Sequence, residues 1–246
     1  MTPAFGTAAV EIAVQSAAGA RSAIAAGADR LELCQALEVG GLTPSLALVE
    51  AVCDAVGGER VNVLVRPRGG GFVYDADEIA VVAADVRAIV ACGAGGVVVG
   101  ALDEAGLVDR AALQRWRAAA GDATVTFHRA IDASAHPDEV LDALLAEGVD
   151  RVLTSGGALR SIDGVERLAA HVTRVGGAME VMAGGGVTPA DIPAILASGV
   201  DAVHLSARAR AGLGASAGPG GGTAGHDVTD ATVVAAAVAA ARPPRG

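Results

Sequence analysis

The stretch TVTFHR at residues 124–129 alternates apolar and polar side chains. Val125 and Phe127 share one face of the expected strand, because successive strand side chains point to opposite faces. Thr126 and His128 share the other face, which in a parallel barrel would point into the lumen, where branched apolar residues normally lie. Because burying polar groups is costly, this pattern indicates a functional site.

The same alternation recurs in four other short segments of the chain. They lie near residues 8–14, 30–34, 61–66 and 202–206. In each segment one phase is apolar and suited to packing against helices, and the other phase carries polar groups. The titratable or charged members of that polar phase are Glu11, Glu32, Arg66 and His204.

Strand-like and helix-like runs alternate along the whole chain. The expected strands lie near 8–14, 30–34, 61–66, 96–100, 124–129, 151–155, 180–183 and 202–206. The expected helices lie near 16–26, 44–56, 77–91, 109–119, 137–146, 161–174, 189–197 and 228–241. Eight such units in 246 residues predict an α/β fold, a single (β/α)₈ TIM barrel over residues 1–246. An open doubly wound sheet is the alternative, although no G-x-G-x-x-G follows the first strand.

Two segments fall outside this pattern. The glycine-rich residues 211–226 are expected to form a flexible loop between the last strand and the last helix. That loop is either a tolerated insertion or a lid over the barrel mouth. The tail at residues 242–246 is expected to be frayed.

The composition excludes several classes of function. A formal net charge of −10 argues against nonspecific nucleic-acid binding. No apolar run is long enough to span a membrane, and the start lacks a secretory signal, so a cytoplasmic location is expected. All 18 basic residues are arginine. Without a lysine amine, neither Schiff-base nor pyridoxal-phosphate (PLP) chemistry is available.

Functional groups of TIM barrels lie at the carboxyl ends of the strands and in the loops that follow. The candidates for acid–base catalysis are His128, Glu11, Glu32 and Arg66. The alternative is a buried ion-pair network in which Glu11 and Glu32 are neutralised by Arg66 or Arg129. Such networks contribute little net stability, so several buried charges favour a functional explanation.

Glycine-rich loops and arginines at the expected barrel mouth predict an anion site. Arginine suits bidentate recognition of carboxylate or phosphate, and glycine lets backbone N–H groups approach a ligand. The predicted anion-binding residues are Arg68, Ser155, Gly156, Gly157, Gly184, Gly185, Gly186, His204 and Ser206. The alternatives are a salt-bridged loop after the third strand and glycine turns that serve backbone geometry alone.

Three cysteines are too few and too widely spaced for a disulfide framework. Cys53 and Cys92 fall in or at the end of helices and are expected to be structural. Cys34 ends the second strand in the polar phase and is the one credible soft metal ligand. Met182 shares that phase but is more typical of a core residue.

Seven stretches taken together resemble the CutC copper-homeostasis family. They are GADRLELC (27–34), GGLTPS (40–45), RPRGG (66–70), VTFHRAID (125–132), RVLTSG (151–156), GGGV (184–187) and VHLSA (203–207). The resemblance runs from about residue 8 to residue 241. It implies a TIM barrel, a cytoplasmic location, self-association as a dimer or tetramer, and a role in copper homeostasis with Cu(I) as a ligand.

In the family, copper assignment rests on cysteines near the ends of the first two strands. Cys34 matches the second position, whereas Ala13 occupies the first. One thiolate does not close a tight Cu(I) site, although His128 and His204 could complete a weaker one. Two functions therefore stay open: a Cu(I)-binding protein that uses Cys34, or an enzyme that acts on a small phosphate or carboxylate by acid–base chemistry.

Overall fold

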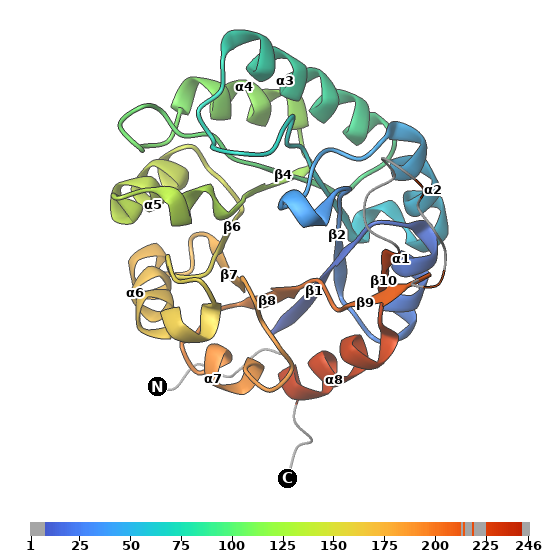
Figure 1. Cartoon of the computed structure of the whole chain (residues 1–246). Helices are drawn as coiled ribbons and strands as arrows, with labels where there is room; N and C mark the ends of the chain where they lie inside the picture. Colours follow the sequence, from blue (N-terminus) through green and yellow to red (C-terminus); the bar gives the residue numbers. More distant parts are fainter. Residues whose placement is uncertain (1–7, 213, 215–217, 219–224, 243–246) are drawn as a thin grey trace.

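The computed structural model describes residues 8–212, 214, 218 and 225–242. Within them, eight parallel strands close a barrel in chain order, as Figure 1 shows. The strands are β1 (Ala9–Val14), β2 (Arg30–Leu33), β3 (Val61–Leu64), β4 (Gly96–Val99), β5 (Thr124–Phe127), β6 (Arg151–Thr154), β7 (Glu180–Gly184) and β8 (Ala202–Leu205). The predicted (β/α)₈ barrel is confirmed, and the open-sheet alternative is wrong because β8 pairs with β1.

The helices form a ring around the barrel (Figure 1). They are α1 (Ala17–Ala25), α2 (Leu46–Val56), α3 (Ala76–Ala91), α4 (Arg110–Ala120), α5 (Pro137–Ala146), α6 (Val165–Val175), α7 (Ile192–Leu196) and α8 (Ala231–Ala241). Side chains of Ser16, Ser45 and Asp75 cap the first exposed N–H groups of α1, α2 and α3. Among the described residues, no helix is both long and apolar enough to cross a membrane.

The main hydrophobic core lies between the strands and the helices. Val10, Ile12, Val125 and Phe127 are fully buried there, as the alternating pattern predicts. Among the described residues, the lumen holds two small apolar clusters apart from this core. These are Cys34 with Leu64 and Val98, and Leu153 with Met182 and Ala202. The rest of the lumen is available for polar groups.

An ion-pair network crosses the lower part of the lumen. Arg30 Nε lies 2.8 Å from Glu11 Oε2, and the same guanidinium pairs with Glu180. Arg151 pairs with Glu180 at 2.9 Å and donates to the Thr126 hydroxyl at 3.0 Å. The expectation that Arg66 or Arg129 would neutralise Glu11 is wrong, because the register of β1 on β2 sets Glu11 directly opposite Arg30.

A hairpin after β8 differs from the sequence expectation. β9 (Arg208–Ala211) pairs antiparallel with β10 (His226–Thr229), so α8 begins at Ala231 and not at residue 228. Asp227 holds the hairpin through both Arg208 and Arg210. Most of the expected flexible loop 211–226 and of the expected frayed tail lies outside the described residues. The alternative that this loop forms a lid over the barrel mouth is therefore not tested.

Candidate functional site

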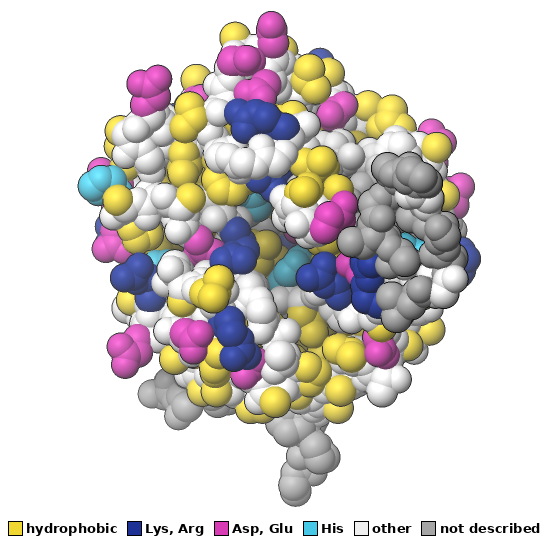
Figure 2. Space-filling model, viewed as in Figure 1, with side chains coloured by type: hydrophobic (Ala, Val, Ile, Leu, Met, Phe, Trp, Pro, Cys, Tyr) yellow, Lys and Arg dark blue, Asp and Glu magenta, His cyan; other side chains and the backbone are white. Residues whose placement is uncertain are grey.

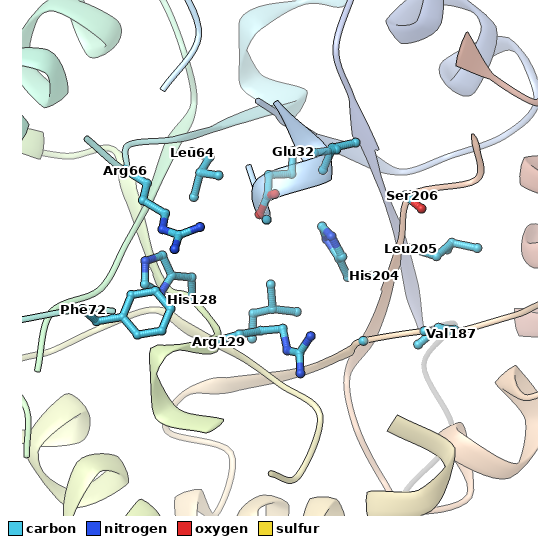
Figure 3. Close-up of a pocket in the computed structure, with 15 residues that line it drawn as sticks. Glu32, Leu64, Arg66, Phe72, His128, Arg129, Val187, His204, Leu205 and Ser206 are labelled. Atoms are coloured by element: carbon cyan, nitrogen blue, oxygen red, sulfur yellow. The ribbon is translucent and has the colours of Figure 1, made fainter. Parts of the chain in front are cut away.

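A cavity of about 230 Å³ opens at the carboxyl ends of the strands. Its lining includes seven predicted site residues, Glu32, Arg66, His128, Gly185, Gly186, His204 and Ser206. In Figure 3, Arg66 and His128 lie on one side of the cavity, and Glu32 and His204 lie on the other. The cavity is smaller than the ~300 Å³ at which drug-sized pockets begin, so it suits a small metabolite.

Arg66, which follows β3, is a buried cation without a carboxylate partner among the described residues. Its guanidinium donates to the backbone carbonyls of Val39, Gly41 and Gly70, and its Nε has no partner. The guanidinium carbon lies 5.1 Å from the centre of the Phe72 ring. A buried charge that contacts carbonyl dipoles and aromatic rings but no carboxylate favours an anionic ligand beside it.

His128 is a neutral hydrogen-bond donor rather than a base. It follows β5 directly and caps the 3₁₀ helix Arg129–Ala133, and its Nδ1 accepts from the Ala130 N–H at 3.1 Å. The proton of the neutral ring is therefore on Nε2, which is buried without a partner in the described chain. Burial and the charge of Arg66 lower the pKa of His128 to about 3.

On the opposite side of the cavity, His204 pairs with the fully buried Glu11. Glu11 Oε1 lies 2.9 Å from His204 Nδ1, and Glu11 Oε2 also accepts from Arg30 and Asn62. Burial alone would raise the pKa of Glu11, but the His204 hydrogen bond and the Arg30 charge hold it at about 2. Burial opposes the charge on His204, yet the Glu32 and Glu11 carboxylates raise its pKa.

Glu32 lies beside this pair, and its pKa is shifted in the opposite direction from that of Glu11. It is 6% exposed and makes no hydrogen bond with the described residues. Burial, with a smaller contribution from the Glu11 charge, raises its pKa to about 7, although the charge of His204 acts in the opposite direction. A carboxyl with a pKa near neutrality can both accept and donate a proton, which acid–base catalysis requires.

The structure corrects the prediction for Arg68. This side chain lies outside the cavity, where it pairs with Glu78 of α3 and lies over the ring of Tyr74. Glu78 is already fixed by the capping box at the start of α3, so it supplies a counter-charge on the outer side of the loop. Only Arg66 of the RPR motif faces the cavity.

The loop after β6 also departs from the prediction. Ser155, Gly156 and Gly157 do not line the cavity. The carboxylate of Asp132 accepts from the N–H groups of Ser155 and Gly157 and from the Thr154 hydroxyl. The Asp132 carboxylate thus occupies the position in which the glycine-rich sequence predicted a bound anionic ligand.

The loop after β7 does reach the cavity. Gly185 and Gly186 line it with φ values of 133° and 58°, which glycine adopts without strain. In the described residues, the backbone N–H groups of Gly186, Val187 and Ser206 have no partner. Gly184 lies in the strand itself and is packed against Leu153 and His204, outside the lining.

Cys34 does not fit a Cu(I) site. The thiol is fully buried next to Leu64 and Val98, and its sulfur lies 3.9 Å from the Val14 carbonyl oxygen. Burial raises the pKa of the Cys34 thiol, which opposes formation of the thiolate that binds metal. The group of three candidate ligands that the described residues bring together, Glu11, Glu32 and His204, contains no sulfur.

Among the lining residues that were not sequence candidates, Phe72 contributes an aromatic ring and Arg129 a charge. Phe72 contacts His128, with ring centres 4.9 Å apart, and Arg129 lines the cavity while it pairs with Asp132 at 2.8 Å. The strand end at His128 could have suggested Arg129, but nothing local marks Phe72. Figure 2 shows arginine side chains distributed around a histidine at the centre of this face.

A family model matches the chain over all eight strands of the barrel. The model is that of the CutC family, and it covers residues 8–209. The chain belongs to the CutC family. A CutC family protein from Xylella fastidiosa is 44% identical over 207 residues, which cover 82% of this chain and 76% of that protein. A relative from Xanthomonas campestris is 45% identical over 200 residues, with 81% and 83% covered.

A solved structure shares the family and the fold. A CutC protein from Streptococcus agalactiae, whose name assigns it to copper homeostasis, has a TM-score of 0.75 and 28% identity, covering 80% of this chain and 97% of that one. A thiamine phosphate pyrophosphorylase from Pyrococcus furiosus has a TM-score of 0.61 at 16% identity, covering 98% of both chains. The second likeness concerns the fold alone.

Proposed function

We propose that this CutC chain is an enzyme that binds a small anionic metabolite and moves a proton on it. The observation that carries the proposal is Arg66, a buried guanidinium on the cavity wall without a carboxylate partner in the described chain. A small carboxylate or phosphate ester supplies the missing negative charge. This counter-charge is the reason to expect an anion rather than a neutral ligand.

Proton transfer is assigned to Glu32 and His204, which lie across the cavity from Arg66. Glu32, with a pKa of about 7, removes a proton from the carbon next to a carbonyl or carboxylate group. His204, oriented by Glu11, is the second proton-handling group. Returning the proton at a neighbouring atom completes an isomerisation that needs no co-reactant.

Arg66 and His128, on the other side of the cavity, stabilise the negative charge that develops on the substrate oxygen. Arg66 carries a fixed positive charge, and His128 offers a neutral Nε2–H group. The N–H groups of Gly186, Val187 and Ser206 offer a further anion subsite. Arg129 contributes positive charge between these two regions (Figure 3).

The test is ligand-induced thermal stabilisation with a panel of small carboxylates and phosphate esters. A compound that binds should raise the melting temperature of the wild type, and Arg66→Gln should remove that rise. Losing one charge-assisted contact corresponds to roughly ten- to hundredfold weaker binding. Arg68→Gln is the matched control, because Arg68 lies one residue beyond Pro67 but outside the cavity.

A compound that passes this test is then incubated in deuterated water. We expect the wild type to exchange a carbon-bound proton of the compound and Glu32→Gln to lose this exchange while it still binds. The proposal is rejected if no anion in the panel stabilises the fold, or if Arg66→Gln and Arg68→Gln respond alike.

Cu(I) binding through Cys34 is the rival function, and the name of the Streptococcus relative supports it. Against it stand the buried thiol and the absence of sulfur from the three-ligand group described above. Competition with a Cu(I) chelator under reducing conditions separates the two functions. We expect weak binding that Cys34→Ala leaves unchanged, whereas tight stoichiometric binding lost in Cys34→Ala would establish a copper protein.

We also propose a cytoplasmic location and assembly into a dimer or tetramer. The three cysteines are unpaired, as is usual where thiols are kept reduced. Cell fractionation and analytical ultracentrifugation test the two statements separately, and neither affects the assignment of the cavity.

A further inference from the structure

A second hollow lies outside the barrel, between the start of α5 and α6. It consists of an inner cavity of about 140 Å³ and an outer one of about 590 Å³. Four residues, Ser134, Pro137, Arg167 and His171, line both. The proposed reaction in the barrel uses none of them.

His171 is the unexplained polar group of this region. Its side chain is only 2% exposed, and neither ring nitrogen has a hydrogen-bond partner in the described chain. A neutral imidazole has one N–H donor and one acceptor, so two polar atoms are buried without compensation. Each such atom costs about 1–3 kcal/mol, and buried polar groups in native proteins nearly always have a partner.

The charged side chains around the hollow differ in whether they have a partner within the described chain. Asp132 is surrounded by donors, Asp138 pairs with Arg174 at 3.2 Å, and Glu139 pairs with His136 at 3.4 Å. Arg167 has no hydrogen-bond or ion-pair partner among the described residues. The charge of Arg167 is therefore open to an anionic ligand.

The start of α5 adds backbone donors. This helix has ten residues, begins with Pro137, and receives no side-chain cap from His136. The N–H groups of Asp138 and Glu139 have no partner in the described structure. Unsatisfied N–H groups at a helix start favour an anion, as does the helix dipole.

We propose that this hollow is a binding site for a phosphate group, held by Arg167, His171 and the first turn of α5. It is independent of the cavity in the barrel. Arg167 also lies against the β6–α6 loop, because a Cβ on Gly157 would be 2.9 Å from its guanidinium nitrogen. An occupant would thus contact the loop that Asp132 holds in place.

The test follows the imidazole resonances of the five histidines by ¹H–¹⁵N NMR while inorganic phosphate is added at constant ionic strength. His171→Asn assigns the resonance of interest. We expect the His171 signals to shift saturably in the wild type and in Arg66→Gln. Arg167→Ala should weaken this response roughly tenfold or more.

Arg115→Ala is the matched control, since Arg115 is exposed on α4 and lines neither cavity. A parallel titration with glycerol phosphate shows whether an ester binds more tightly than free phosphate and so identifies the source of the group. The proposal is overturned if phosphate leaves the His171 signals in place, or if Arg167→Ala and Arg115→Ala respond equally.

Discussion

At the scale of the residue, three acid–base groups in one lumen have pKa values displaced in different directions. Glu11 is held ionised by His204 and Arg30, Glu32 is brought near neutrality by burial, and His128 is kept neutral. The pKa values of Glu11 and Glu32 differ because their hydrogen-bond partners differ. Glu11 has three such partners, whereas Glu32 has no hydrogen bond within the described chain. The proposed division of roles depends on this contrast.

Glu32 should make stability depend on pH. Its pKa rises from 4.5 to about 7 on folding, so between these values the folded state holds a proton that the unfolded state has released. Stability therefore falls as pH rises through this window, by about 3 kcal/mol in total. We expect Glu32→Gln to be more stable than the wild type above pH 7 and similar to it below pH 4.5, by urea denaturation.

Glu38→Gln, at an exposed position, is the control for that measurement. A constant difference between Glu32→Gln and the wild type at every pH would contradict the assigned titration.

At the scale of the element, Asp132 joins two loops. It belongs to the 3₁₀ helix Arg129–Ala133 after β5, and it accepts from Thr154 at the end of β6 and from Ser155 and Gly157 in the loop that follows. The β6–α6 loop is thus held by a carboxylate from the preceding unit. This contact also fixes Arg129, which lines the cavity.

Asp132→Asn should loosen this junction. The amide keeps the size of the side chain but loses the charge and replaces one acceptor with a donor. We expect a loss of about 1–3 kcal/mol in the free energy of unfolding, together with weaker anion binding in the cavity. Asp163→Asn, at an exposed position, should change stability by less than about 0.5 kcal/mol. Equal effects of the two substitutions in denaturant titrations would contradict the proposed role of Asp132 in holding the β6–α6 loop.

At the scale of the whole molecule, the ion-pair network ties distant strands of the barrel together. Arg30 of β2 reaches Glu11 of β1 and Glu180 of β7, and Glu180 also pairs with Arg151 of β6. Because these groups meet across the lumen, the network forms only when the barrel closes.

Glu180→Gln should leave two arginines without their shared carboxylate. Removing one partner from a fully buried pair costs about 3–5 kcal/mol, and the quarter exposure of Glu180 reduces this to about 2–3 kcal/mol. Chemical denaturation measures the loss, and Glu166→Gln on the exposed face of α6 is the control. An unchanged unfolding midpoint for Glu180→Gln would mean that the network does not contribute to closure.

The sequence by itself determined the barrel, the polar lumen and seven residues of the cavity lining. The reason is that strand alternation and the site at the strand ends follow from local order along the chain. It did not determine which arginine neutralises Glu11, because that depends on the register of β1 on β2. Nor did it show that Asp132 occupies the glycine loop after β6.

Only the tertiary structure decided which of two neighbouring arginines faces the cavity. Arg66 is drawn inward by the carbonyls of Val39 and Gly41, and Arg68 is drawn outward by Glu78. These partners are up to 27 residues away in sequence, so no local pattern predicts them. His171 depends on tertiary structure in the same way, since its lack of partners is a property of the packed molecule.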